Sequence, residues 1–246
     1  MRSRKLLVVV AVVLSLYSLL INTSIARPSA RDQMREAIDQ TNKASKVFDE
    51  IMDAPDKGIS RDLLEKVECV AVFPSVIKAA FIFGGKGGKG LVSCRDRETR
   101  AWGPPVFLKI GGGSVGFQIG AEATDLILLG MNSGTIDTFR KNRFELGGEA
   151  TAAAGPVGRS ASASTDLPTI RSQFLSYSRS RGAFAGVALK GSVITRDSDL
   201  TNAAYGEKTS AENVLDGKVN VSSEMMEFQN TLSHYAPGKG RHRSED

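Results

Sequence analysis

Glycine and proline interrupt the chain after residue 66 too often for a long helix to form there. Between these breaks lie short runs rich in valine, isoleucine, leucine and phenylalanine, which is the pattern of β-strands separated by turns. Many short strands at close spacing predict a highly curved antiparallel sheet or a barrel-like body. Glycines inside the runs, such as Gly116, Gly120, Gly186 and Gly191, predict bulges and bends that help such a sheet to close. The runs cover residues 67–73, 75–83, 91–95, 105–110, 115–123, 126–131, 144–155, 174–180 and 183–195.

Helical periodicity is confined to the two ends of the chain. Residues 29–53 place apolar side chains three and four positions apart, which predicts one amphipathic helix that ends before Pro55. Ser60 can cap a short second helix, and residues 210–215 and 222–235 predict C-terminal helices. We therefore predict an α+β fold with an N-terminal amphipathic helix, a highly curved antiparallel β sheet or barrel-like body, and C-terminal helices.

The first 26 residues predict an exported protein. A basic start at residues 1–5 is followed by an apolar stretch at 6–21 and by the small residues Ser24 and Ala26, in the order of a secretory signal peptide. The alternative is an uncleaved membrane anchor, for which the apolar stretch is slightly short. We expect a signal peptide at 1–26, one domain at 27–236 and a polar tail at 237–246, in a periplasmic, cell-envelope or secreted protein.

The basic character of the chain belongs largely to this leader. The whole sequence carries 32 lysines and arginines against 27 acidic residues, a net charge of +5. The leader holds three of the basic residues and no acidic one, so the rest of the chain has a net charge of only +2. Because no strong basic field remains, we expect no nucleic-acid partner.

Residues 84–90 are five glycines around Lys86 and Lys89. The segment is not a P-loop, because Phe83 and Gly90 stand where that motif needs glycine and serine or threonine. Its glycines predict the turn of a hairpin, whose main-chain N–H groups and two ammonium groups could bind a phosphate anion. The alternative is a plain β-turn with lysines that favour solubility. Residues 111–116 match a dinucleotide-binding motif but precede a strand rather than a helix, so we expect no nucleotide cofactor.

The histidine content argues against catalysis. His234 and His242 are the two histidines of the chain, and both lie near its C-terminus. The β-rich region therefore lacks the histidine that the usual nucleophilic pairs and metal clusters require. Asp125 interrupts an apolar run and is more typical of a hydrogen-bonded structural residue beside Thr124 than of a catalytic base. We expect a protein that is not an enzyme, with no catalytic residue, metal or cofactor.

Cys69 and Cys94 are the two cysteines of the chain. An even number in an exported protein favours a disulfide, whereas two buried thiols are the alternative. A hairpin that turned at residues 86–89 would place Cys94 near Ala80 rather than near Cys69. The sequence therefore leaves the disulfide open.

Seven short motifs follow one another along the chain: CVAVFP at 69–74, the glycine-rich segment at 83–90, AWGPP at 101–105, GFQIG with TD at 116–125, GPVGR at 155–159, YSRSRG at 177–182 and AYG at 204–206. Together they resemble the SYLF-domain family, and the resemblance covers roughly residues 38 to 217. What this resemblance implies is a lipid-binding module: eukaryotic members recognise phosphoinositides, partly through an N-terminal amphipathic helix, and one yeast branch binds actin.

The resemblance places the lipid-binding role on Lys43 and Lys46 of the first helix and on Lys86 and Lys89. An exported chain does not meet cytosolic phosphoinositides or actin, so we expect a secreted, bacterial-type member that binds an anionic phospholipid or an envelope glycolipid without chemical turnover. Two alternatives come from other classes. One is a structural or protein-binding envelope protein whose helix packs on its own sheet, and the other is a carboxylate-dependent hydrolase centred on Asp125.

The leader makes a direct prediction about processing. Because its three segments match a cleavable signal peptide, protein recovered from its native compartment should begin near Arg27. Mass spectrometry of the intact protein checks this, and a mass that includes Met1 or Arg2 would replace cleavage with anchoring.

Overall fold

A computed structural model describes residues 28–54, 58–80, 83–115, 120–156, 172–180, 183–187 and 189–238. The expected signal peptide, most of the expected tail and the predicted strand glycine Gly116 lie outside the described residues. From Arg31 onward the chain forms one compact unit.

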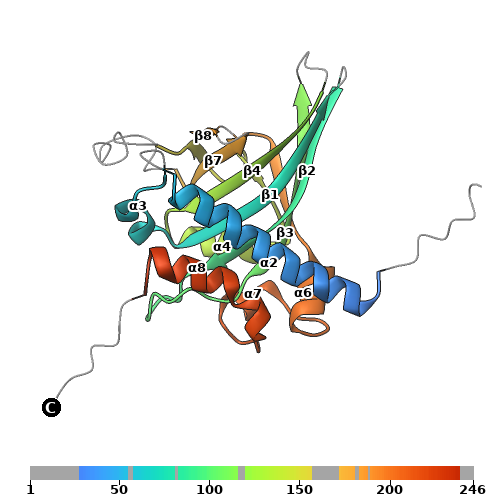
Figure 1. The fold of residues 1–246 in the computed structure, drawn as a ribbon, viewed down its shortest axis with the longest axis vertical. Helices are drawn as coiled ribbons and strands as arrows, with labels where there is room; N and C mark the ends of the chain where they lie inside the picture. Colours follow the sequence, from blue (N-terminus) through green and yellow to red (C-terminus); the bar gives the residue numbers. More distant parts are fainter. Residues whose placement is uncertain are drawn as a thin grey trace, which may run out of the picture. The chain divides into compact units, whose positions relative to one another are not determined.

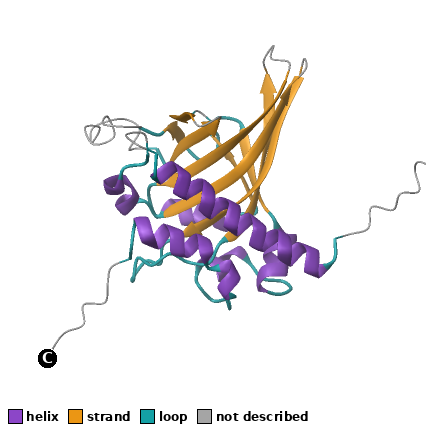
Figure 2. Ribbon diagram, viewed as in Figure 1, coloured by secondary structure: helices purple, strands orange, loops and turns teal. Residues whose placement is uncertain are grey.

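The described strands form one nine-stranded sheet in the order β5-β9-β3-β2-β1-β4-β7-β6, with β8 paired to β7 (Figure 2). Every pair is antiparallel except β6 with β7. The strands are β1 (Cys69–Ala80), β2 (Phe83–Cys94), β3 (Val106–Val115), β4 (Gly120–Gly130), β5 (Arg143–Leu146), β6 (Ala152–Ala154), β7 (Phe174–Ser180), β8 (Ala183–Gly186) and β9 (Ser192–Arg196).

The sheet curls until its two ends meet. Phe144 of β5 stacks on Phe174 of β7 with ring centroids 5.9 Å apart, although five strands lie between β5 and β7 in the order of the sheet. A bridge between Leu146 and Ala150 links the same two ends. The α+β class with a curved, barrel-like sheet is therefore confirmed.

Most of the helices come from the two ends of the sequence, and they pack around the sheet (Figure 1). The predicted first helix is α2, Ser60 caps α3 as expected, and the predicted helix at 210–215 is α7, which Ser210 caps. The predicted helix at 222–235 is divided into η2 and α8, while α4 and α6 were not predicted. The helices are α2 (Ala30–Met52), α3 (Arg61–Lys66), α4 (Gly134–Arg140), α6 (Ser198–Tyr205), α7 (Ala211–Leu215), the 3₁₀ helix η2 (Ser223–Met225) and α8 (Glu227–Tyr235). None of the described helices has the length and apolar character to cross a bilayer.

Both faces of the central strands are buried. On one face, called here the α2 side, Val70, Val72 and Ile127 pack with Phe48 of α2 and Phe228 of α8. On the opposite face, called the inner side, alternate residues of the same strands form a second core with α4 and α7. The apolar stripe of α2 is thus used within the protein: Ala37, Ala44, Val47, Phe48 and Ile51 are all buried.

The prediction that residues 84–90 form a hairpin turn is wrong. These residues continue β2, which begins at Phe83 and pairs with β1 up to the contact of Ala80 with Gly84. Glycine tolerates extended backbone, so five of them can remain in a strand whose neighbours hold it on both sides. The resulting register places Cys69 opposite Cys94, and the structure joins them in a disulfide.

Strand β1 contains a bulge between Val72 and Ile77, where its pairing with β2 and with β4 shifts by one residue. Ser75 lies in the bulge with φ of 53°, a conformation uncommon for a residue other than glycine. The bulge brings Val72 and Phe73 so close to β2 that a Cβ atom on Gly90 would lie 2.3 Å from the Val72 carbonyl oxygen and 2.5 Å from the Phe73 ring. Glycine at position 90 is therefore required by packing.

This packing predicts that Gly90→Ala destabilises the protein by about 1–3 kcal/mol, because the added methyl group has no space. Gly113→Ala is the matched control on β3: no atom lies within 4 Å of its Cβ position, and its φ is ordinary. The control should leave the free energy of unfolding unchanged or raise it by up to about 1 kcal/mol, because alanine loses less backbone entropy on folding than glycine does. Chemical denaturation measures both, and equal effects would refute the steric role of Gly90.

Candidate functional site

Lys86 and Lys89 lie on opposite faces of β2, because three positions separate them and side chains of a strand alternate. Lys89 lies on the α2 side and forms an ion pair with Glu36 of α2. Lys86 lies on the inner side, in the same alternating set as Val92 and Cys94. The two lysines therefore cannot act together around one turn as the sequence suggested.

The direct neighbour of Lys86 is Lys78 of β1, which stands opposite it in the ladder. On the other flank Lys86 faces Gly112 of β3, and a Cβ atom there would lie 3.2 Å from the Lys86 Cε atom. Burial lowers the pKa of Lys86, and the charge of Lys78 lowers it further. Within the described residues, neither lysine forms an ion pair with a carboxylate.

Glu122 and Thr124 of β4 complete the inner side of this region. Glu122 stands opposite Lys78 and accepts a hydrogen bond from the hydroxyl group of Ser180. Thr124 is 3% exposed, and its hydroxyl group has no hydrogen-bond partner among the described residues. We call Lys78, Lys86, Glu122 and Thr124 the inner-side cluster.

Figure 1 shows that β1, β2, β3 and β4 extend together past the helices at one end of the sheet, and the inner-side cluster belongs to β1, β2 and β4. We call this end the projection; its described residues are 76–80, 83–90, 111–115 and 120–124. The sequence suggested Lys86 but missed Lys78, because the pairing of the two depends on the turn and the bulge. The signal that could have revealed it is the strand character of residues 75–83, which continues up to Ala80.

The two helix lysines have acidic partners on their own helix. Lys43 lies 2.6 Å from Asp39, and Lys46 lies 4.0 Å from Glu50, each one turn away. Such exposed pairs are weak, but each lysine already has a carboxylate nearby.

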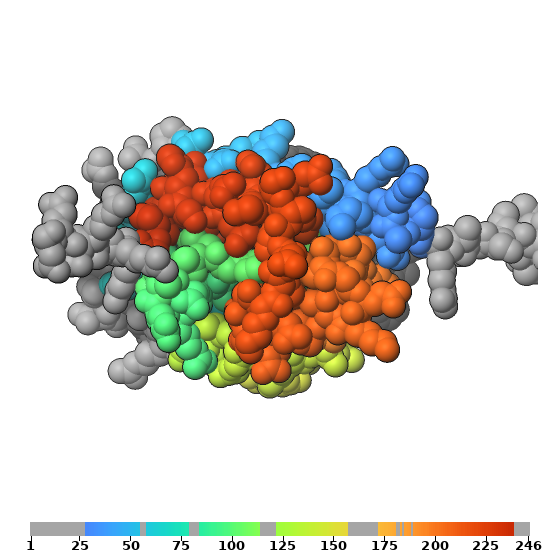
Figure 3. Space-filling model, turned by 90° about the horizontal axis from the view of Figure 1, so that it is seen from below, coloured from blue at the N-terminus to red at the C-terminus, as the bar shows by residue number. Residues whose placement is uncertain are grey.

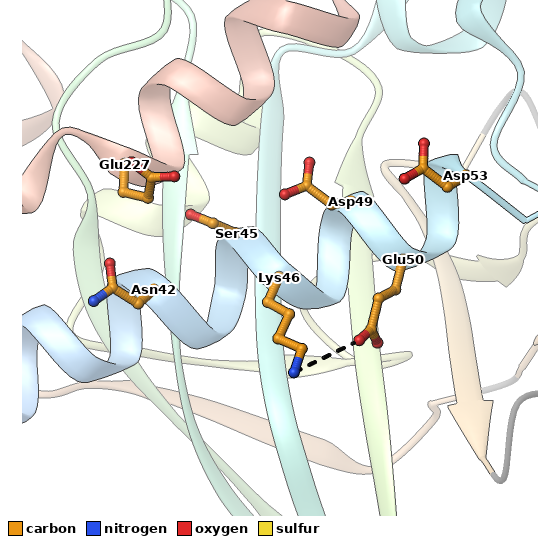
Figure 4. Close-up of a pocket in the computed structure, with 7 residues that line it drawn as sticks. All are labelled: Asn42, Ser45, Lys46, Asp49, Glu50, Asp53 and Glu227. Carbon is orange, nitrogen blue, oxygen red and sulfur yellow. Dashed lines mark ion pairs between the residues drawn. The ribbon is translucent and has the colours of Figure 1, made fainter.

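A shallow groove between α2 and α8 is mostly acidic (Figure 4). Asp49 and Asp53 lie on the side of α2 that faces α8, and Glu227 begins α8, while Lys46 and Glu50 pair on the other side of α2. Burial raises the pKa of Asp49, a hydrogen bond with Tyr235 acts in the opposite direction, and the charges of Asp53 and Glu227 raise it further. The groove beside the helix lysines therefore carries more acidic than basic side chains.

Asp125 is tied into a structural network on the α2 side. Its Oδ1 atom accepts a hydrogen bond of 2.9 Å from the backbone N–H of Ser75 in the bulge. Its Oδ2 atom accepts bonds of 3.2 and 3.1 Å from Nε and Nη2 of Arg179, which also pairs with Glu50 of α2. This agrees with the interpretation of Asp125 as a hydrogen-bonded structural residue, and its partners are Ser75 and Arg179.

The C-terminal segment is held by Arg95, whose charged side chain is buried. Arg95 stacks on Trp102 at 4.1 Å, and both donate hydrogen bonds of 2.9 Å to the carbonyl oxygen of Ala236. Figure 3 shows the C-terminal segment side by side with the segment near residue 100. Burial lowers the pKa of Arg95 to about 10. Because its donors are used for main-chain carbonyls, Arg95 holds the fold together.

The fold and the cluster define an α+β protein with a nearly closed, curved sheet and a basic site on its inner side. In the described part of the chain, no group of three His, Cys, Asp or Glu side chains is placed to hold a metal ion.

Comparison with known proteins identifies the family. Residues 111–235 match the family model described as Ysc84, Las17-binding protein actin regulator, so the chain belongs to the Ysc84 family, in agreement with the SYLF resemblance. No solved structure shows significant similarity.

Relatives occur in fungi and mammals. The chain is 37% identical over 60% of its length to the SH3 domain-containing protein PJ696.02 of Schizosaccharomyces pombe, where it covers 35% of that protein. It is 28% identical over 84% of its length to LAS seventeen-binding protein 3 of Saccharomyces cerevisiae, with 47% of that protein covered. It is 33% identical over 72% of its length to the human SH3 domain-containing YSC84-like protein 1, with 53% of that protein covered. The chain spans about half the length of the curated relatives that it matches, and the secreted, bacterial-type assignment stays a prediction.

The Asp125 network predicts an energetic coupling with Arg179. Asp125→Asn removes the charge from the pair but keeps an oxygen for Ser75, whereas Arg179→Met removes the guanidinium group. In a double-mutant cycle by chemical denaturation, the two changes should be non-additive by about 0.5–2 kcal/mol, because both residues share one contact. Additive effects would contradict the network.

Proposed function

We propose that this protein binds anionic phospholipid at a membrane surface and carries out no chemical turnover. The observation that carries the proposal is the pair Lys78 and Lys86, directly opposite each other on the inner side of the projection. Like charges opposite each other destabilise a sheet by a few tenths of a kcal/mol to about 1 kcal/mol. An anion between the two ammonium groups turns this repulsion into attraction.

The surroundings of the pair support an anion rather than another ligand. Gly84, Gly88 and Gly112 lie on the same side of β2 and β3, so no other side chain of these strands crowds the two lysines at those positions. The projection also extends past the helices, which leaves its end accessible to a surface (Figure 1). A lysine near an anionic membrane contributes about 1 kcal/mol of attraction.

Helix α2 is a weaker candidate for the membrane contact. Its apolar stripe is buried against the sheet, Lys43 and Lys46 have acidic partners, and the groove beside it is acidic. Lys89 is occupied by Glu36. Of the four lysines that the resemblance suggested, Lys86 is therefore the one we retain.

A second candidate function is the binding of a protein partner. The matched family is described as a Las17-binding actin regulator, and the relative from Saccharomyces cerevisiae is named LAS seventeen-binding protein 3. For this chain, the docked α2 and the acidic groove favour a partner with basic side chains. If the expected leader directs export, the encountered membrane is an envelope or outer surface, and the lipid is an anionic phospholipid or glycolipid found there.

The proposal predicts that Lys78→Gln/Lys86→Gln weakens binding to anionic vesicles by about 2 kcal/mol, or roughly thirtyfold. Sedimentation with vesicles of increasing phosphatidylglycerol content measures this. The matched control is Lys43→Gln/Lys46→Gln, which removes the same charge from α2 and should change affinity less than threefold. High salt should reduce wild-type binding, because it screens exposed charges.

Two outcomes would reject the proposal. If the wild type binds neutral and anionic vesicles equally, charge does not determine binding. If it binds neither kind, the partner-binding function becomes the better explanation. A larger effect of the α2 pair would move the membrane contact from the projection to the helix.

A further inference from the structure

The α2 side of the projection has a composition opposite to that of the inner side. Side chains of a strand alternate, so this surface is built from every second residue of β1 to β4. In one row across the sheet, Ile77 stands between Ala123 of β4 and Gly87 of β2, and Gly87 pairs in turn with Gly111 of β3. We call this surface the flat patch, and its described members are Ile77, Gly85, Gly87, Gly111, Gly113 and Ala123. None of these six residues is charged or has a polar side chain.

The described part of the chain leaves the flat patch uncovered. Ile77 is 56% exposed and Met226 is 40% exposed, and these are the large hydrophobic side chains that stand out as exposed among the described residues. A Cβ atom at Gly113 would meet no atom within 4 Å. At Gly85 and Gly87 the nearest atoms would be main-chain oxygens of the neighbouring β3, at 4.0 and 3.9 Å. An open apolar surface of this kind marks a contact site.

Helix α2 bounds the flat patch at its base. Lys89, the next residue of β2 on this side after Gly87, pairs with Glu36 of α2. Glu50 of α2 pairs with Arg179 of β7, and beyond this helix the strands of the projection continue alone (Figure 1). The surface therefore forms a step, with α2 above the sheet on one side and open sheet on the other. Sheets pack about 10 Å apart, so one further sheet on the flat patch would continue the layer that α2 begins.

From this geometry we infer that the flat patch is a self-association surface on which the projection of a second copy of this chain packs. The α2 sides of the two projections face each other and their tips point in opposite directions, which keeps each α2 clear of the other copy. A two-fold contact brings the same surface together twice, so any charge in it would meet its like. The flat patch has no charge, and it supplies both a protruding side chain, Ile77, and a glycine surface that receives one. This contact needs no lipid and goes beyond the proposed function.

The size of the flat patch sets the strength of the contact. Four strands at a spacing of about 4.8 Å and about four residues at roughly 3.3 Å each give an area of roughly 250 Å² per copy. The total of about 500 Å² is well below the roughly 1,200–2,000 Å² of a stable protein–protein interface. We therefore expect a weak dimer, with a dissociation constant of roughly 0.1–1 mM, that forms where the protein is concentrated.

The test uses protein that begins at Arg27, because the chain from Arg31 onward forms one compact unit and the apolar leader would itself associate. Sedimentation equilibrium from about 10 μM to about 1 mM should show the wild type changing from monomer towards dimer. Ile77→Asp should weaken this association at least about tenfold, because the contact would bury two unpaired carboxylates. The matched control is Met226→Asp at the start of α8, which should leave association unchanged.

Gly87→Val separates a shaped contact from general hydrophobic attraction. The valine adds apolar surface and has room within its own chain, since the nearest atom to its Cβ position is 3.9 Å away. It also raises the surface that receives Ile77 of the second copy, so we expect association to weaken about fivefold. Stronger association of this variant would indicate indiscriminate hydrophobic attraction and would reject the two-fold contact.

Thermal unfolding checks that the variants are folded. If Ile77→Asp is destabilised, Ile77→Ala takes its place and should weaken association about threefold. A wild type that stays monomeric at about 1 mM, or equal behaviour of the Ile77 and Met226 variants, overturns the self-association surface. Because the assay contains no lipid, either result leaves the vesicle experiments on Lys78 and Lys86 to decide the proposed function. A monomeric wild type whose vesicle binding is lost in Ile77→Asp would assign the flat patch to the membrane instead.

Discussion

The bulge in β1 determines which side chains meet on the projection. Up to Phe73, odd-numbered residues of β1 face the inner side, as Cys69 and Ala71 show. The extra residue between Val72 and Ile77 reverses this alternation, so Val76 and Lys78 face the inner side instead. Without the bulge Lys78 would lie on the α2 side, and Lys86 would have no second lysine. The hydrogen bond from Ser75 to Asp125 holds the bulge, and Arg179 connects it to α2.

The two sides of the sheet differ in charge as a consequence. On the α2 side, two of the described basic groups near the projection have acidic partners: Lys89 pairs with Glu36, and Arg179 pairs with Asp125 and Glu50. These pairs connect α2 to the sheet at two separate places and leave little free positive charge there. On the inner side Lys78 stands between Lys86 on β2 and Glu122 on β4, and among the described residues Glu122 forms no ion pair with either lysine. An anionic ligand therefore finds more free positive charge on the inner side of the sheet than on the side of α2.

The amino-acid sequence predicted what depends on local patterns. The periodicity of residues 29–53 gave α2, and the glycine-separated runs gave a curved antiparallel sheet. Helices α4 and α6 were missed because they are short and depend on tertiary contacts, such as the burial of Ile136 and Phe139 in the inner core. The turn was misplaced because glycine usually marks turns, whereas here neighbouring strands hold the glycines extended. Lys86 could be named, but Lys78 and Thr124 could not, since only the bulge and the register bring them together.

The glycines of the projection also connect its stability with its ligand. At Gly88 and Gly90 a side chain would collide with β1, so packing requires glycine. At Gly85, Gly87, Gly111 and Gly113 a Cβ atom would have ample space, yet glycine is present there too. Each glycine in a strand costs about 0.5–1 kcal/mol relative to alanine and removes a side chain that could pack across the ladder. The projection therefore depends on main-chain hydrogen bonds more than the rest of the sheet does, and the repulsion between Lys78 and Lys86 weakens it further. An anion held by both lysines, as proposed, would supply the cross-strand link that the side chains lack, so that binding and local order at this end of the sheet would reinforce each other.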